Sequence, residues 1–122
     1  MNASNTLGEQ GESIAFYYLV NKGYTILGKN VRFGKIELDL VAEKDGVVVV
    51  VEVKARSSDD YGTPESFVNE EKENFLVEGL SYYLNKYELD CEARIDVIAI
   101  LIKEGTFELR HHEGAVYGFD LP

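Results

Sequence analysis

Hydrophobic and polar positions recur with two different periods along the chain, and these periods predict helices and strands in a definite order. Residues 8–22 repeat apolar positions at helical spacing, whereas residues 24–32 and 36–41 alternate with the period of two that strands show. A nearly continuous run of valines at 47–53 is typical of a strand covered on both faces. The chain is therefore predicted to begin as one helix followed by three strands.

The second half of the chain predicts one more helix and further strands. Residues 65–87 carry a long helical stripe, which Pro64 is suited to start. Residues 95–102 are typical of a buried strand, and residues 107–111 predict a short last strand. We therefore expect an α/β fold with a mixed central sheet flanked by helices. A length of 122 residues predicts a single domain over residues 1–122.

The composition narrows the classes of protein to consider. An apolar content of 45% is typical of a globular protein, and no apolar run is long enough to predict a membrane span. The first residues lack the basic and apolar regions of a signal peptide, so we expect a cytoplasmic protein. Cys91 is the only cysteine, which excludes an intrachain disulfide and a zinc site built on several cysteines.

The charge of the chain is strongly negative and unevenly distributed. A net charge of −10 argues against a nucleic-acid binder, because such proteins usually carry a basic surplus. However, residues 57–92 hold ten acidic residues against two lysines, whereas the seven acidic and seven basic residues of segment 1–56 balance. A surface formed by the first segment can therefore be neutral or basic.

The candidate chemistry follows from the turn between the second and third strands. If Asp45 and Gly46 are the central residues of a two-residue turn, Asp39 lies directly opposite Glu52. The period of two then places both carboxylates on one face with Lys54. Because facing like charges destabilise a sheet, this arrangement favours a cation between them. Two carboxylates with room for water suit Mg²⁺.

A plainer interpretation is that Glu52 and Lys54 are solvated charges at a strand end. Glu37 and Lys54 would then form a surface ion pair worth less than about 1 kcal/mol. We favour the site, because the run at 47–53 is too apolar for a solvated edge. The end of a buried central strand is also where α/β folds place their sites.

Charged residues also interrupt the apolar faces of both predicted helices. Glu12 shares the inward face of the first helix, and Lys72 lies on the inward stripe of the second. Each alone is typical of a side chain that reaches along an apolar face to solvent. Together with the strand residues they form a convergent set, in which Lys54 is suited to orient a water and offset charge during phosphoryl transfer. Asp96 is a further inward candidate, which a hydrogen bond at the strand start explains equally well.

Several segments together resemble one known family. These segments are GESIAFYYL at 11–19, KGYTIL at 22–27, NVR at 30–32, ELDLVA at 37–42, VEVKARS at 51–57, RIDV at 94–97 and HEGAVY at 112–117. In their order and spacing they resemble the YraN-like family, an uncharacterised bacterial family with the fold of restriction endonucleases and Holliday-junction resolvases. The resemblance covers nearly the whole chain.

The resemblance implies a nuclease-type site of the Asp…Glu-x-Lys kind. Its residues here are Asp39, Glu52 and Lys54, with Glu12 from the first helix and Lys72 from the second. Such sites bind Mg²⁺ or Mn²⁺ through the two carboxylates and a backbone carbonyl, here that of Val53. We therefore expect a metal-dependent nuclease that hydrolyses phosphodiester bonds in DNA, with branched or junction DNA as a candidate substrate. Junction resolvases act as symmetric pairs, so a homodimer is a further expectation.

The alternative is a non-catalytic module that retains the nuclease fold and binds nucleic acid or protein. The predicted helix at 65–87 is acidic, whereas nuclease relatives tend to be basic there. A basic protein partner would complement the acidic segment 57–92, although a solvated helix face accounts for the same charges. Bases of single-stranded nucleic acid could also stack on tyrosines of the two helices, although packing is another use of these rings. The tyrosines are Tyr17, Tyr18, Tyr82 and Tyr83.

Overall fold

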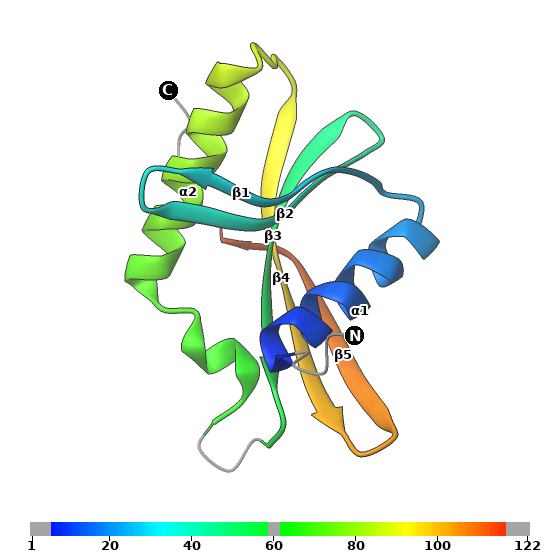
Figure 1. Cartoon of the computed structure of the whole chain (residues 1–122). Helices are drawn as coiled ribbons and strands as arrows, with labels where there is room; N and C mark the ends of the chain where they lie inside the picture. Colours follow the sequence, from blue (N-terminus) through cyan, green and yellow to red (C-terminus); the bar gives the residue numbers. More distant parts are fainter. Residues whose placement is uncertain (1–5, 59–61, 117–122) are drawn as a thin grey trace.

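Five strands form one mixed sheet in the computed structural model, which describes residues 6–58 and 62–116 (Figure 1). The strands lie across the sheet in their order along the chain. The elements are α1 (Leu7–Asn21), β1 (Thr25–Phe33), β2 (Ile36–Lys44), β3 (Val47–Arg56), the 3₁₀ helix η1 (Pro64–Phe67), α2 (Glu70–Lys86), β4 (Glu92–Lys103) and β5 (Thr106–Val116). This order confirms the predicted α/β fold.

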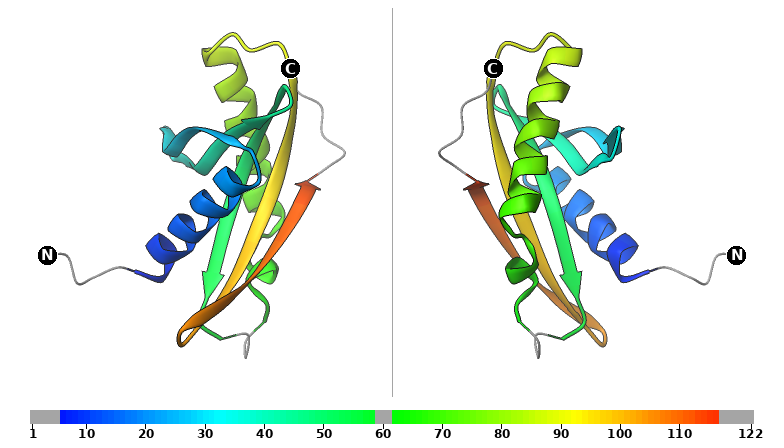
Figure 2. Two further views of the ribbon diagram at one scale, coloured as in Figure 1. Left: turned by 90° about the vertical axis from the view of Figure 1, so that its right-hand side faces the viewer. Right: turned by 90° about the vertical axis from the view of Figure 1, so that its left-hand side faces the viewer.

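The two long helices cover opposite faces of the sheet, as the side views in Figure 2 show. Neighbouring strands are antiparallel except β3 and β4, which are parallel. Parallel neighbours need a crossover connection, and here η1 and α2 provide it. Ala15 and Leu19 of α1 pack on one face, and Leu76 and Leu80 of α2 pack on the other. Because both faces are covered, β3 is apolar throughout its central part.

Strands β2 and β3 separate halfway along β2. They pair only where Leu40 to Lys44 face Val51 to Val47, which is the register that the Asp45-Gly46 turn predicts. The earlier residues of β2 remain paired with β1, and in Figure 1 this hairpin turns across the direction of β3, β4 and β5. The separation begins where the sequence places Asp39 and Glu52.

Two elements, α2 and β5, differ most from their predicted boundaries. The helix predicted over 65–87 begins only at residue 70, because Val68 is extended and the Asn69 side chain caps α2 by accepting the Lys72 N–H at 2.9 Å. The last strand is longer than 107–111, because β5 follows β4 from Lys103 to Ile95. Residues 59–61 of the acidic segment lie outside the described residues. None of the described helices combines the length and apolar character that crossing a membrane requires.

Candidate functional site

Glu52 is a buried carboxylate at the point where β2 leaves β3. The residue is 1% exposed, and its Oε1 atom has no hydrogen-bond partner among the described residues. Its Oε2 atom lies 3.3 Å from the Nζ of Lys72 and 4.0 Å from the Nζ of Lys54. A buried oxygen without a donor is rare in native proteins and requires an explanation, of which a bound ion is one.

Asp39 is fixed beside Glu52 by the backbone of β3. Its Oδ2 accepts the N–H of Val53 at 2.9 Å, one step beyond the last backbone pair of the two strands. The Asp39 carboxylate thus accepts the hydrogen bond from the Val53 N–H that a backbone carbonyl of the neighbouring strand would otherwise accept. Asp39 and Glu52 therefore lie close together, as the predicted register requires, although the ladder ends one pair before them.

The proximity of the two carboxylates changes the protonation of Glu52. Burial, followed by the negative charge of Asp39 and a hydrogen bond shared with it, raises the pKa of Glu52 to about 8. The positive charges of Lys72 and Lys54 act in the opposite direction without cancelling this effect. In the metal-free protein Glu52 therefore keeps a proton at neutral pH.

The donor set at this position fits a hard divalent cation. Asp39 and Glu52 supply two carboxylates, and Val53, whose carbonyl is the third predicted ligand, is held next to both by its N–H. Mg²⁺ prefers such oxygen donors and keeps several waters. Across residues 6–58 and 62–116 no group of three or more His, Cys, Asp or Glu side chains is arranged for a metal. The site therefore offers two carboxylates rather than three, and the Val53 carbonyl is the further ligand that the resemblance implies.

Both predicted lysines reach this carboxylate from separate elements. Lys54 follows Glu52 by two residues in β3 and therefore shares its face. Lys72 lies in the first turn of α2, four residues before the buried Leu76, so its side chain is directed at the sheet. The two side chains are 28% and 34% exposed, so each ammonium group has access to solvent.

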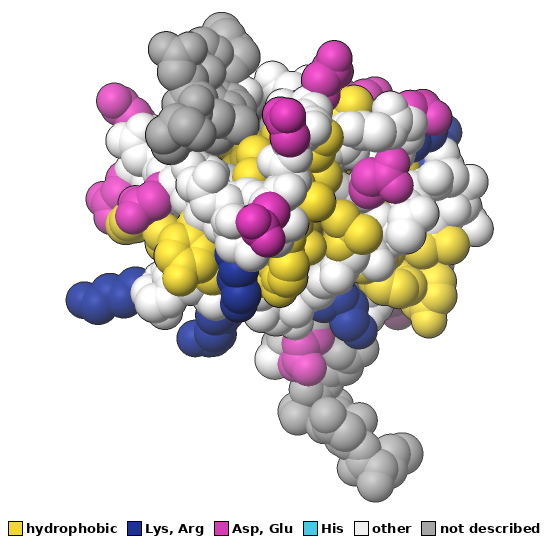
Figure 3. Space-filling view, turned by 90° about the horizontal axis from the view of Figure 1, so that it is seen from above, with side chains coloured by type: hydrophobic (Ala, Val, Ile, Leu, Met, Phe, Trp, Pro, Cys, Tyr) yellow, Lys and Arg dark blue, Asp and Glu magenta, His cyan; other side chains and the backbone are white. Residues whose placement is uncertain are grey.

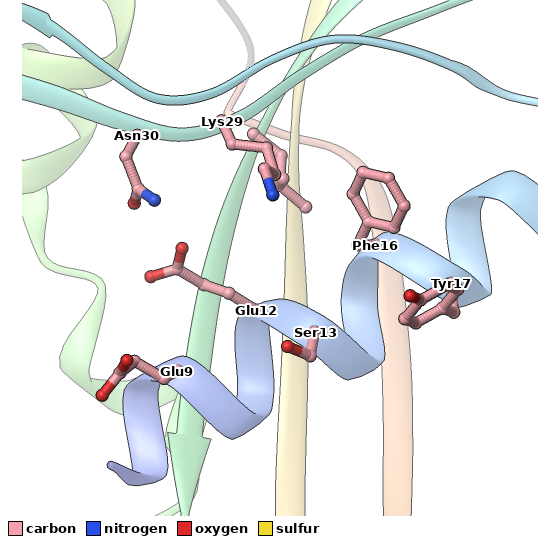
Figure 4. Close-up of a pocket in the computed structure, with 8 residues that line it drawn as sticks. Glu9, Glu12, Ser13, Phe16, Tyr17, Lys29 and Asn30 are labelled. Atoms are coloured by element: carbon pink, nitrogen blue, oxygen red, sulfur yellow. The ribbon is translucent and has the colours of Figure 1, made fainter. Parts of the chain in front are cut away.

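Glu12 approaches the site from α1 and lies beside Asp39. Burial and then the charges of Asp39 and Glu37 raise the pKa of Glu12, although a hydrogen bond from the Asn30 side chain lowers it. Figure 4 shows the Glu12 carboxylate turned toward Asn30 of β1. Asn30 lies in the NVR segment at 30–32, but no sequence pattern predicted it as a site residue. Its backbone has a φ of 50°, a left-handed conformation that Asn tolerates better than most residues.

Asp96, the further inward candidate, belongs to a separate buried network. Its carboxylate accepts from Arg94 at 2.9 Å, from His111 Nε2 at 2.8 Å and from the Gly114 N–H at 2.9 Å. Burial raises the pKa of Asp96, but these hydrogen bonds outweigh it and hold the pKa below the usual value. The Tyr18 hydroxyl lies 2.9 Å from the other ring nitrogen of His111. Asp96 therefore connects β4, β5 and α1 and is explained by packing.

Comparison with known proteins places the chain in one family. Residues 11–100 match the sequence model of the Uncharacterised protein family UPF0102, and this span contains every residue of the candidate site. UPF0102 protein FP2501 of Flavobacterium psychrophilum is 41% identical, covering 98% of this chain and 100% of the relative. A UPF0102 protein of Phocaeicola vulgatus is 37% identical, covering 96% and 97%. As the YraN-like resemblance predicts, the chain belongs to the family UPF0102.

Proposed function

We propose that this protein is a metal-dependent nuclease that hydrolyses phosphodiester bonds in DNA. The observation that carries the proposal is the state of Glu52, which is buried with an unsatisfied oxygen beside Asp39 and has a pKa raised to about 8. A divalent cation between the carboxylates accounts for both features. The resemblance to nucleases with an Asp…Glu-x-Lys site supports the same assignment.

The carboxylates and the lysines have distinct roles in this proposal. Asp39, Glu52 and the Val53 carbonyl would hold Mg²⁺ or Mn²⁺. When bound, such an ion polarises the scissile phosphate and lowers the pKa of water. Lys54 donates a hydrogen bond to the attacking water and offsets the negative charge that develops on the phosphate. Lys72 contacts a neighbouring phosphate oxygen.

Glu12 acts beside the two metal-binding carboxylates. A hydrogen bond from the Asn30 side chain holds its carboxyl group, and the charge of the nearby Asp39 is one cause of the raised pKa of Glu12. From this position it orients a water on the α1 side of the site, or helps to hold a second ion. The ammonium groups of Lys54 and Lys72 lie within 4.0 Å of Glu52, so the roles of these two lysines are tied to Glu52.

The charge of the protein restricts how DNA can bind. On the face shown in Figure 3, most Lys and Arg side chains gather along one edge, while most Asp and Glu side chains spread over the remainder. A DNA strand can therefore approach along a limited basic strip. With a net charge of −10, affinity for duplex DNA is expected to be weak and steeply dependent on salt. Branched or junction DNA, which exposes phosphates at flexible positions, is the favoured substrate.

The test is cleavage by purified protein at low salt with Mg²⁺ or Mn²⁺. Duplex, junction, flap and single-stranded DNA are compared for the wild type, Glu52→Gln and Lys54→Ala. Glu78→Gln, an exposed acid on α2, and Lys103→Ala, a surface lysine, are the matched controls. Metal-dependent cleavage that only the two site variants lose supports the proposal. Its absence on every substrate, or its survival in Glu52→Gln, overturns it.

The second candidate function is a non-catalytic binding module, which the acidity of residues 57–92 favours. That segment carries a net charge of −8 and would attract a basic protein. Metal-induced stabilisation without cleavage on any substrate would favour this candidate. Sedimentation of the purified protein, alone and with DNA, tests the homodimer that the resemblance to resolvases suggests.

A further inference from the structure

A polar hollow with two aromatic walls lies between α1 and the β1 strand, next to the candidate site. Its volume is about 370 Å³, within the range of about 300–1,000 Å³ that small-molecule sites occupy. We name it the α1–β1 pocket; its lining includes Glu12, Ser13, Phe16, Tyr17, Lys29 and Asn30, and Glu9 and Leu40 complete it. Figure 4 shows Lys29 and Asn30 extending from β1 toward α1, which presents the other labelled side chains, Glu9 among them.

Tyr17 offers this pocket an aromatic face that packing does not use. It is 66% exposed, and its ring meets the Phe16 ring edge to face, with centroids 5.2 Å apart. The other helical tyrosines are engaged elsewhere: Tyr82 packs on the Phe33 ring, with centroids 4.3 Å apart. Tyr83 is buried, and the Tyr18 hydroxyl contacts His111. Tyr17 is therefore an exposed ring on a rigid helix, the kind of surface on which a nucleobase stacks.

The remaining lining supplies the polar groups that a nucleotide needs. The Nζ of Lys29 lies 5.4 Å from the centroid of the Phe16 ring, so a positive charge stands over the aromatic wall. Asn30 and Ser13 bring an amide and a hydroxyl that can pair with the edge of a base. The pocket thus combines a stacking face, hydrogen-bonding groups and one cation for a phosphate, with the carboxylates of Glu9 and Glu12 on its α1 wall.

Glu12 connects the pocket to the candidate metal site. It lines the pocket, and its carboxylate lies close enough to Asp39 for the two charges to interact. A nucleotide in the pocket would therefore lie next to the phosphate on which the proposed chemistry acts. A base stacked within a duplex must first be unpaired to enter, which costs a few kcal/mol, whereas an unpaired base enters without that cost.

We infer that the α1–β1 pocket binds one unpaired nucleobase of a DNA strand whose adjacent phosphate lies at the Asp39–Glu52 site. This inference rests on the proposed nuclease function and names its substrate class: DNA with single-stranded, flapped or bulged nucleotides. Tyr17 is the stacking residue, and Lys29 holds a flanking phosphate.

The test uses a short single-stranded DNA that contains one 2-aminopurine, with the matching full duplex as its comparison. Binding is measured in Ca²⁺, with the DNA checked to be intact. Stacking on Tyr17 should quench the 2-aminopurine fluorescence. Tyr17→Ala should weaken single-strand binding by about 5- to 100-fold and leave duplex binding unchanged. Tyr17→Phe should retain the wild-type affinity. Tyr82→Ala, at a tyrosine of α2 that is 55% exposed, is the matched control.

A second variant tests the pocket by blocking it instead of removing the stacking ring. Ser13 is exposed on the same helix, so Ser13→Trp fills the hollow without disturbing the core and should also weaken single-strand binding. The inference is overturned if neither variant changes single-strand affinity, if both DNA forms lose affinity equally, or if the wild type does not bind single strands. Quenching that depends on Tyr17, without cleavage of any substrate, would reject the nuclease function and retain the nucleobase pocket. Cleavage that Tyr17→Ala leaves unchanged would retain the nuclease function and reject the pocket.

Discussion

Raising the pH should destabilise the metal-free protein, and Glu52→Gln should remove most of this effect. The pKa of Glu52 is about 8 in the folded protein and 4.5 in its ordinary state. Between these values the folded state holds a proton that the unfolded state has released, so stability falls as the pH rises. Each pH unit in this window corresponds to about 1.4 kcal/mol. From about pH 5.5 to about pH 7.5, Glu52 should therefore cost the wild type roughly 2–3 kcal/mol of unfolding free energy.

Urea denaturation in EDTA, followed by far-UV circular dichroism at a series of pH values, measures this loss. Gln has nearly the shape of Glu and no proton to release, so the stability of Glu52→Gln should depend less on pH by about the stated amount. All other titrating groups are common to both proteins, so the difference between the two curves isolates Glu52. Glu78→Gln, an exposed acid, should follow the wild type. Equal slopes for the wild type and Glu52→Gln would refute the raised pKa of the buried Glu52 carboxyl.

Three further predictions concern the metal, the DNA and the core. Mg²⁺ or Mn²⁺ should raise the Tm, and the rise should be larger at about pH 8 than at about pH 6. At the lower pH the cation must displace the proton of Glu52, which weakens its binding. Asp39→Asn should lose most of this rise in a thermal scan, and an unchanged rise would exclude the site. Lys29→Ala should reduce the salt slope of DNA binding by about 1 in fluorescence anisotropy, whereas an equal slope would remove Lys29 from the interface. Gly11→Ala should lower the unfolding free energy in urea by about 1–3 kcal/mol, because the new Cβ would lie 2.6 Å from the Cβ of Ala55. An unchanged unfolding free energy would mean that α1 moves aside.

The features that could be predicted from the sequence depend on local rules. Asp45 and Gly46 have φ values of 54° and 80°, as a type I′ turn requires, and this short turn fixes the register of β2 and β3. The register in turn brings Asp39 toward Glu52. Helical spacing was sufficient to predict that Lys72 faces the sheet, because the buried Leu76 lies one turn later on the same face of the helix.

The features that the sequence did not reveal depend on contacts between distant segments. Pro64 suggests a helix start, yet the Asn69 cap determines where α2 begins. The contact between Tyr18 and His111 joins residues 93 positions apart, so no local pattern predicts it. Asn30 carries no periodic signal, and its role depends on where α1 places Glu12.

The hydrogen bond from the Val53 N–H to Asp39 makes one backbone amide a spectroscopic reporter of the site. The resonance of an amide that donates to a carboxylate responds when that carboxylate gains a proton or an ion. In ¹⁵N-labelled protein, the Val53 cross-peak can therefore be followed through a titration with any divalent cation, including those that support no turnover. The chain thus contains its own indicator of cation occupancy, and it can be observed in solution before any substrate is known.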